Sequence, residues 1–256
     1  MLQVSRLGRS SVTVRRGDPD ETERRGDRSV RADRACARGA LAASGYPLTL
    51  IDLPGDGVEQ LESCGITEPL DLAQPPPADL FDAVDVVVHL AADADPNAPW
   101  ERLLSANIQA SYHVVSAALT AGCRRVILAS SVHAVLGSDR RPVSPEGPVA
   151  PVDLYGVTKC FCEALAYWCA HSHPISAAAV RIGAYQTVEA SRQPDARWMA
   201  DTFIAQPDLN GLLERAINAV YRFAILHAAA PGREVLLDTR PTEDLLGWRA
   251  AHRFPA

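Results

Sequence analysis

The run VDVVVHLAA, residues 84–92, is a β-branched stretch that ends in two small residues. Runs of this kind are typical of strands buried on both faces of a parallel sheet. Three more runs share the pattern: PLTLID at 47–52, RRVILASS at 124–131 and AAAVRIGA at 177–184. Helical patterns follow at about 100–121, 155–171 and 208–222. Strands that alternate with helices predict an α/β fold with a doubly wound parallel sheet.

Composition narrows the class of protein. Hydrophobic residues make up 47% of the 256, which excludes wholesale disorder, and a net charge of −6 argues against a broad nucleic-acid surface. No apolar run reaches the roughly 18 residues of a membrane span, and the N-terminus lacks the apolar core of a secretory signal. We expect a soluble cytoplasmic protein that binds neither nucleic acid nor membrane. The six cysteines lack the paired spacing of metal ligands, so reduced thiols and no metal site are expected.

Three regions differ in character. Residues 1–39 are rich in arginine and carboxylates and predict an aberrant or disordered segment, although SVTV at 11–14 offers a substitute strand. Residues 40–184 carry the strand and helix pattern of a nucleotide-binding core, and 185–256 are expected to bind the substrate. The apolar stretches at 108–119 and 212–226 predict helices of the core or of a homodimer interface.

Tyr155 and Lys159 form a Y-x-x-x-K pair near the start of a predicted helix, so both side chains lie on one helix face. Lys159 is the only lysine among 25 basic residues. A phenol is a poor base at neutral pH, and a nearby ammonium favours its ionised form. The pair is suited to acid/base chemistry between a carbonyl and an alcohol, although the same spacing also occurs on plain surface helices.

Other polar groups follow the predicted strands, where ligands bind in open α/β sheets. Ser130 and Ser131 come after the run RVILA and can hydrogen-bond a substrate oxygen, or simply cap a turn. Asp52 ends the run LTLI, where a carboxylate can bind ribose hydroxyls or serve a turn. The small residues Ala91 and Ala92 would let a cofactor approach the backbone.

These pieces together resemble the extended short-chain dehydrogenase/reductases of the NAD-dependent epimerase/dehydratase family. The resemblance rests on LTLIDL, VVVHLAA, WERLLSANIQASYHVVSAALTAGCRRVILASS, LYGVTKCFCEALA, VRIGA and TEDLLGW, and covers roughly residues 40–250. The PW…L..NI segment and the SS-x-H tetrad are most similar to uronate dehydrogenase-like members. The resemblance implies a Rossmann-like fold, NAD as cofactor and a sugar or sugar-acid substrate.

The resemblance also implies roles for individual residues. Tyr155 would transfer the proton and contact the cofactor, and Lys159 would tune Tyr155 and hold the nicotinamide ribose. Ser131 would orient the reacting oxygen, and Asn107 would be the catalytic asparagine on the helix that lines the cofactor site. The remaining implied contacts fall into two groups. The cofactor would meet Asp52, Asp71, Leu72, Leu90, Ala91, Ala92, Ile182 and Gly183, and the substrate would meet Ser131, His133 and, for a carboxylate, Arg197.

Two departures from the uronate dehydrogenase pattern bear on which substrate is expected. Ala94 and Ala184 stand where uronate dehydrogenases place serines, and Val132 replaces the asparagine of their SSNH. A uronate is therefore less expected than a less polar sugar acid or another hydroxyl substrate.

The phosphate-binding motif T-G-x-x-G-x-x-G of the family is missing from the N-terminal region. Reading the codons from Glu23 to Ala37 one base later permits S-V-V-V-T-G-A-S-G-R-I-G-R-A-L, a strand followed by that motif. Our hypothesis is that residues from about 18 to 38 are out of frame, and the alternative is a genuinely divergent N-terminus. The chain as written is expected to bind NAD weakly or not at all.

Two functions therefore remain open. One is an NAD-dependent oxidoreductase or sugar epimerase that uses Tyr155 as acid/base. The other is a non-catalytic family member with impaired cofactor binding, either decayed or frameshifted.

Overall fold

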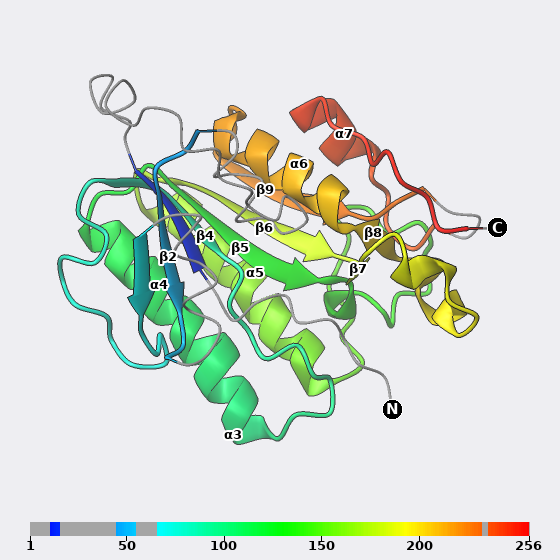
Figure 1. Cartoon of the computed structure of the whole chain (residues 1–256), viewed down its shortest axis with the longest axis horizontal. Coiled ribbons are helices and arrows are strands. Elements are labelled where there is room, and N and C mark those ends of the chain that lie inside the picture. Colours follow the sequence, from blue (N-terminus) through cyan, green and yellow to red (C-terminus); the bar gives the residue numbers. More distant parts are fainter. Residues whose placement is uncertain (1–10, 16–44, 55–65, 232–234, 256) are drawn as a thin grey trace.

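The computed structural model describes residues 11–15, 45–54, 66–231 and 235–255. Within these residues, seven strands form one sheet in the order β3-β2-β1-β4-β5-β6-β9 (Figure 1). A separate parallel pair, β7 (Ala184–Gln186) and β8 (Phe203–Ala205), lies beyond the end of β6. The strands of the large sheet are β1 (Ser11–Arg15), β2 (Leu48–Asp52), β3 (Ile66–Pro69), β4 (Val84–His89), β5 (Arg125–Ser131), β6 (Ser176–Ile182) and β9 (Phe223–Ala228).

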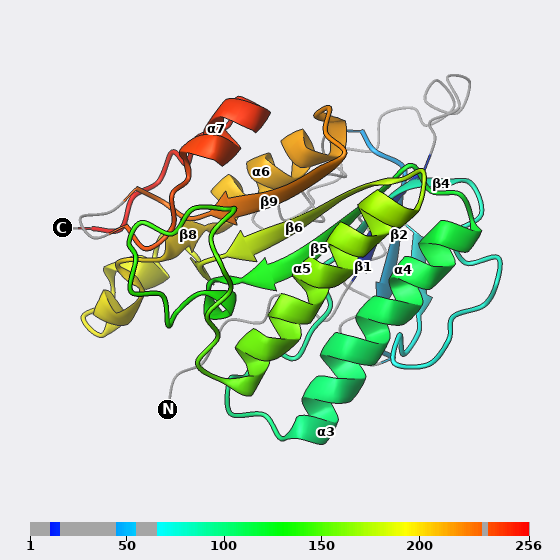
Figure 2. The same cartoon turned by 180° about the vertical axis from the view of Figure 1, so that it is seen from behind.

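Helices cover both faces of the sheet, as Figures 1 and 2 show. One face carries α4 (Ala110–Thr120) and α5 (Leu154–Ser172), and the other carries α6 (Gln206–Asn218). A short α3 (Trp100–Leu103) and a π-helical segment η2 (Leu104–Gln109) lead into α4, and α7 (Arg240–Leu246) follows β9. Three single turns of 3₁₀-helix complete the list: η3 (Val132–Ala134), η4 (Ala190–Arg192) and η5 (Ala196–Met199).

The strand side chains alternate between two apolar layers, as a doubly covered sheet requires. Val86 and Val88 of β4 pack in the layer that α6 closes with Leu209, Leu212 and Leu213. Val87, between them in sequence, packs instead in the layer that α4 and α5 close. The strand runs at 47–52, 84–92 and 124–131 and the three helices expected from the sequence are therefore confirmed, and the chain has an α/β fold with a mainly parallel sheet.

The strand β1 is the exception to the parallel sheet. It lies between β2 and β4 and runs antiparallel to both. Ser11 pairs with Ile51 and His89, at the carboxyl ends of β2 and β4, whereas Arg15 pairs with Val84 at the amino end of β4. SVTV does supply a substitute strand, as its sequence allowed. The wholly parallel sheet expected from the sequence is wrong at this position, because a strand of either direction can pair with two free edges.

Two further expectations need correction. Residues 223–226 were expected to continue an apolar helix, but they belong to β9, which pairs in parallel with β6. The run AAAVRIGA is not one strand, because it breaks at Gly183 into β6 and β7. Ser11–Arg15 and β9 also belong to the core sheet, although they lie outside 40–184 in the sequence. The segment 16–44, in which the glycine motif is missing, lies outside the described residues.

Candidate active site

Two neighbouring cavities lie at the carboxyl ends of the parallel strands. Cavity A, of about 420 Å³, is lined by residues that follow β2, β3 and β4 and by the start of the α3–α4 segment. Cavity B, of about 830 Å³, is lined by residues that follow β4, β5 and β6. Ala92 lines both cavities, so they adjoin at the end of β4. An elongated ligand could therefore place one part in cavity A and another part in cavity B.

Ser131, the last residue of β5, lines cavity B. Its Oγ accepts a hydrogen bond from the backbone N–H of His133 at 3.2 Å and so caps the turn η3. The hydroxyl proton takes no part in that bond. Ser131 is thus both the turn cap and a group that can donate to a ligand oxygen in cavity B.

The start of α5 places Tyr155 and Lys159 beside Ser131. Asp153 caps the helix by accepting a hydrogen bond from the Gly156 N–H at 2.6 Å. Tyr155 and Lys159 both line cavity B, and their exposed fractions are only 6% and 3%. The Lys159 Nζ lies 5.5 Å from the centre of the Tyr155 ring and donates to the carbonyl of Ala129 at 3.0 Å. A buried ammonium next to a phenol is the arrangement that the sequence predicted.

Gly156 allows α5 to approach η3 this closely. A Cβ at this position would lie 2.4 Å from the carbonyl oxygen of His133, which no side chain can tolerate. Gly183 is equally constrained, because a Cβ there would lie 1.8 Å from the carbonyl oxygen of Thr202. Both glycines therefore bring backbone segments together around cavity B.

His133 lies against Tyr155, with ring centres 5.2 Å apart in an edge-on arrangement. Its Nδ1 is 2.7 Å from Oδ2 of Asp153, which fixes the ring and leaves Nε2 outside that contact. The sequence analysis missed Asp153. An aspartate directly before a predicted helix is a common N-cap, and that signal could have found it.

Asn107 is brought to α5 but does not line either cavity. It is fully buried in the π-helical segment η2, a feature often found at functional sites. Its Oδ1 accepts from the Asp93 N–H at 2.7 Å, and its Nδ2 donates to Thr158 Oγ1 at 2.9 Å. Thr158 in turn donates to the Tyr155 carbonyl at 2.7 Å. Asn107 thus holds the first turn of α5 against the loop that borders both cavities.

The residues expected to contact a cofactor divide between the two cavities. Asp71, Leu72, Ala91 and Ala92 line cavity A, and Leu90, Ala92, Ile182 and Gly183 line cavity B. Asp52 ends β2 and accepts from the Leu53 N–H at 2.8 Å, and Leu53 lines cavity A.

Arg197 is exposed on η5 and is not among the residues that line cavity B, whereas its neighbour Trp198 is. Ala94 and Ala184 both line cavity B.

His89 lies buried at the end of β4, with Nε2 3.2 Å from Ser111 Oγ. Burial, together with the positive charge of Lys159, lowers the pKa of His89 to about 3. His89 is therefore neutral at physiological pH, so it adds no second positive charge beside Lys159.

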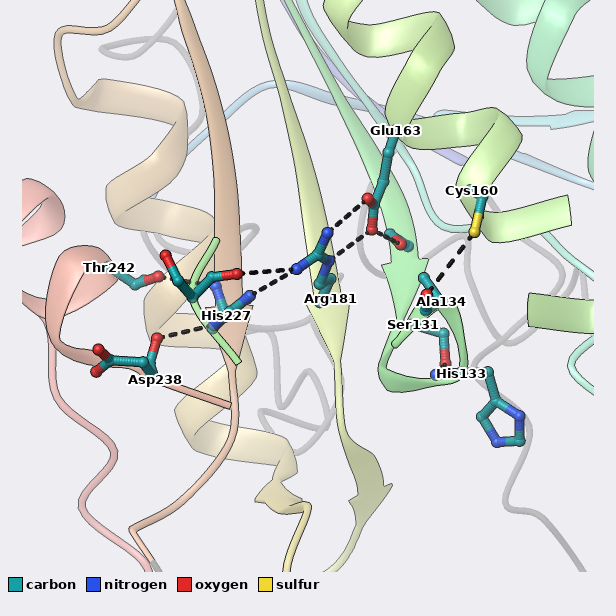
Figure 3. Close-up of polar contacts among 11 residues, drawn as sticks. Ser131, His133, Ala134, Cys160, Glu163, Arg181, His227, Asp238 and Thr242 are labelled. Atoms are coloured by element: carbon teal, nitrogen blue, oxygen red, sulfur yellow. Dashed lines mark hydrogen bonds and ion pairs between the residues drawn. The ribbon is translucent and has the colours of Figure 1, made fainter. Parts of the chain in front are cut away.

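Behind Ser131 lies a buried ionic group in which Glu163, Arg181 and His227 meet (Figure 3). Together with Ser130, which hydrogen-bonds Glu163, these residues form the Glu163 cluster. Arg181 donates from Nε and Nη2 to the two Glu163 oxygens at 2.8 and 2.9 Å, and Ser130 donates to Oε1 at 2.7 Å. The cluster joins β5, β6 and α5, the three elements that supply Ser131, Ile182 and Lys159. Sequence analysis missed it, although Glu163 follows Lys159 by four residues on the same helix face.

His227 completes this cluster from β9. Its Nδ1 lies 2.8 Å from the Asp238 carbonyl, to which it donates, so Nε2 accepts from Arg181 Nη1 at 3.3 Å. Burial lowers the pKa of His227 to about 4, although the hydrogen bond to the Asp238 carbonyl acts in the opposite direction. The imidazole is neutral and orients the guanidinium.

In the part of the chain that the structure describes, no group of His, Cys, Asp and Glu side chains is arranged to hold a metal ion. The described helices include none with the length and apolar character needed to cross a membrane.

Comparison with known proteins identifies the family of the chain. The model of the NAD dependent epimerase/dehydratase family matches residues 34–206, which is more than half of the chain. An L-arabinose 1-dehydrogenase (NAD(P)(+)) of Haloferax volcanii is 31% identical over 158 residues, covering 54% of this chain and 62% of that protein. A uronate dehydrogenase of Pseudomonas syringae is 32% identical over 140 residues, covering 54% of this chain and 48% of that protein. The chain thus matches less than two thirds of the length of either relative.

The fold is shared with a solved uronate dehydrogenase. A mutant of the enzyme from Agrobacterium tumefaciens, solved in complex with NAD, superposes with a TM-score of 0.70 at 27% identity. The superposition covers 83% of this chain and 78% of that one.

Proposed function

Because this chain belongs to the NAD-dependent epimerase/dehydratase family, we propose that it is an NAD-dependent oxidoreductase or epimerase acting on a hydroxyl or carbonyl of a sugar. One observation carries the proposal: Ser131, Tyr155 and Lys159 converge on cavity B, which adjoins cavity A at Ala92. Sugar dehydrogenases among the relatives support the substrate class.

The lining of the two cavities fits most of a dinucleotide. The small residues Ala91 and Ala92 leave the backbone open at the junction, and Asp71 supplies a carboxylate in cavity A for ribose or adenine groups. Leu90, Ile182 and Gly183 would border the nicotinamide in cavity B. When bound there, NAD would supply a hydride acceptor or donor.

The diphosphate is the part that fits poorly. In dinucleotide folds, the loop after the first strand cradles the diphosphate at the carboxyl edge of the sheet. Here β1 runs antiparallel, so Arg15 lies at the amino end of β4, away from both cavities. The lining of cavity A also includes Asp71, Asp93 and Glu101, and Asp93 is already paired with Arg102. Weak NAD binding follows from this arrangement.

The chain's own residues perform the proton chemistry in this proposal. Tyr155 takes the proton of the substrate hydroxyl during oxidation and returns it during reduction. The Lys159 ammonium stabilises the ionised phenol, and Ser131 orients the reacting oxygen. His133, held by Asp153, lies beside Tyr155 and contacts the same end of the substrate. These residues would have the same roles in an epimerase and in a dehydrogenase. Net formation of NADH would identify a dehydrogenase, because an epimerase regenerates NAD in each cycle.

The substitution Tyr155→Phe tests the proposal. With millimolar NAD and a panel of aldoses and uronates, the unmodified chain is expected to form NADH. Removal of the hydroxyl should lower kcat by at least about 100-fold, the usual contribution of acid/base catalysis. Tyr112→Phe on the exposed surface of α4 is the matched control and should leave kcat unchanged. Unchanged turnover in Tyr155→Phe would remove Tyr155 from the mechanism.

A second candidate, a family member with impaired cofactor binding, is favoured by the direction of β1. Calorimetry with NAD is expected to give a dissociation constant in the millimolar range or no binding. Replacing residues 23–37 with the shifted reading S-V-V-V-T-G-A-S-G-R-I-G-R-A-L should restore micromolar affinity. Micromolar NAD binding by the unmodified chain would contradict this candidate, and a coding sequence that does not spell the glycine motif would contradict the frameshift.

A further inference from the structure

Cavity B contains a buried polar side chain that the proton chemistry does not use. Gln186, the last residue of β7, lines cavity B and is only 7% exposed. Within the described part of the chain, no hydrogen bond joins its side-chain amide to another group. The amide oxygen and nitrogen are not sealed in the core, so they open onto cavity B, where a ligand can reach both the donor and the acceptor.

The backbone around Gln186 is firmly placed. β7 pairs in parallel with β8, with Gln186 opposite Ala205, and the Ala184 N–H donates to the Thr202 carbonyl at 2.8 Å. The close approach of Gly183 to Thr202 fixes the start of β7 against the same segment. Because the backbone of Gln186 is already fixed, binding a ligand at its amide does not carry the entropy cost of ordering a loop.

The chemistry of this end of cavity B is polar but uncharged. Gln186 and Thr202 supply an amide and a hydroxyl, Ala184 supplies no polar side chain, and the half-exposed Trp198 supplies an aromatic face. Among the described residues that line cavity B, the Asp, Glu, Lys and Arg side chains are Asp95 and Lys159. Lys159 already donates to Ala129 and lies beside Tyr155.

We propose that Gln186 is a specificity-determining residue that hydrogen-bonds a hydroxyl of a neutral sugar, in preference to a sugar carboxylate; this inference rests on the proposed function. A carboxamide both donates and accepts, as a sugar hydroxyl does. A carboxylate only accepts, so it would leave the amide oxygen of Gln186 without a donor, and the carboxylate of Asp95 in the same lining disfavours a second negative charge. Trp198 offers a surface on which the apolar face of a sugar ring can pack.

Direct binding tests the inference separately from turnover. Saturation-transfer NMR with L-arabinose and with D-glucuronate, each in the presence of millimolar NAD, gives the dissociation constants. L-arabinose is expected to bind the unmodified chain more tightly than D-glucuronate. Gln186→Leu should weaken L-arabinose binding at least about tenfold, because it removes one hydrogen bond and leaves the substrate hydroxyl unpaired. Gln186→Glu should hold L-arabinose nearly as well and weaken D-glucuronate further.

Gln193→Leu is the control, because Gln193 is exposed and does not line cavity B. Its binding of both sugars should match that of the unmodified chain. If Gln186→Leu lowers the melting temperature, Gln186→Met replaces it in the comparison. Equal L-arabinose binding by the unmodified chain and Gln186→Leu, tighter binding of D-glucuronate, or no binding of L-arabinose would each overturn the inference. Sugar binding without NADH formation would instead contradict the proposed function.

Discussion

At the scale of single residues, the buried lysine is the most informative feature of the chain. Lys159 is 3% exposed, and one of its ammonium hydrogens is committed to the Ala129 carbonyl. The other two ammonium hydrogens remain available toward Tyr155 and cavity B. A guanidinium is larger and planar, and its donors form a fixed fork, so it does not fit the same place. This explains why a chain that otherwise uses arginine keeps a lysine here.

The change Lys159→Arg is expected to lower kcat/KM at least about tenfold, since each 1.4 kcal/mol of lost transition-state stabilisation is a factor of ten. Steady-state NADH formation with the best aldose of the panel measures it. Arg249→Lys, the reverse change on an exposed side chain, serves as the control and should have no effect. Full activity of Lys159→Arg would show that only the charge matters.

At the scale of elements, the Glu163 cluster holds the catalytic segments in register. Glu163 on α5 binds Arg181 on β6 and Ser130 on β5, one residue before Ser131. A buried ion pair does not stabilise a fold strongly, because desolvation offsets the attraction. Breaking it leaves an uncompensated charge in the core. The cluster therefore resists any relative movement of these three elements.

Glu163→Gln should lower the free energy of unfolding by about 3–5 kcal/mol, because the buried Arg181 guanidinium loses its counter-charge. Urea denaturation followed by circular dichroism measures the change. Arg249→Gln breaks an exposed pair with Glu243 and should cost at most about 1 kcal/mol. Equal small effects in both variants would mean that water or another group compensates Arg181.

At the scale of the whole molecule, two buried neutral histidines link folding to pH. The folded-state pKa values of His89 and His227 are lowered to about 3 and about 4, mainly by burial, from 6.5 in the unfolded chain. A lowered histidine pKa means that the unfolded state binds protons first as the pH falls. Their contribution to stability is complete above pH 6.5 and is lost progressively below it.

Between pH 6 and pH 4, each of these histidines should remove up to about 1.4 kcal/mol of stability per pH unit. Urea midpoints measured across this range give the slope. His227→Gln should be less stable at neutral pH but should lose stability less steeply on acidification. His171→Gln, on the exposed end of α5, should leave the slope unchanged. An unchanged slope in His227→Gln would contradict the linkage.

Much of this molecule could be predicted from its sequence. The β-branched runs forecast β2, β4, β5 and β6, because buried parallel strands demand such residues. The Y-x-x-x-K spacing placed Tyr155 and Lys159 on one face of α5, since helix geometry fixes that relation locally. Ser131, His133, Ile182 and Gly183 were expected at the same site, and all of them line cavity B.

Other features were decided only by tertiary structure. The antiparallel direction of β1 depends on which edges β2 and β4 leave free, and FAILH became β9 because β6 offered it a partner. Glu163, Arg181 and Gln186 carry no local signal strong enough to identify their partners, and the N-cap signal of Asp153 does not reveal its contact with His133. Their roles come from contacts across 18 residues or more, or from facing a cavity that several strands enclose. Local sequence fixes periodicity and short-range spacing, whereas long-range pairing depends on the whole chain having closed around its core.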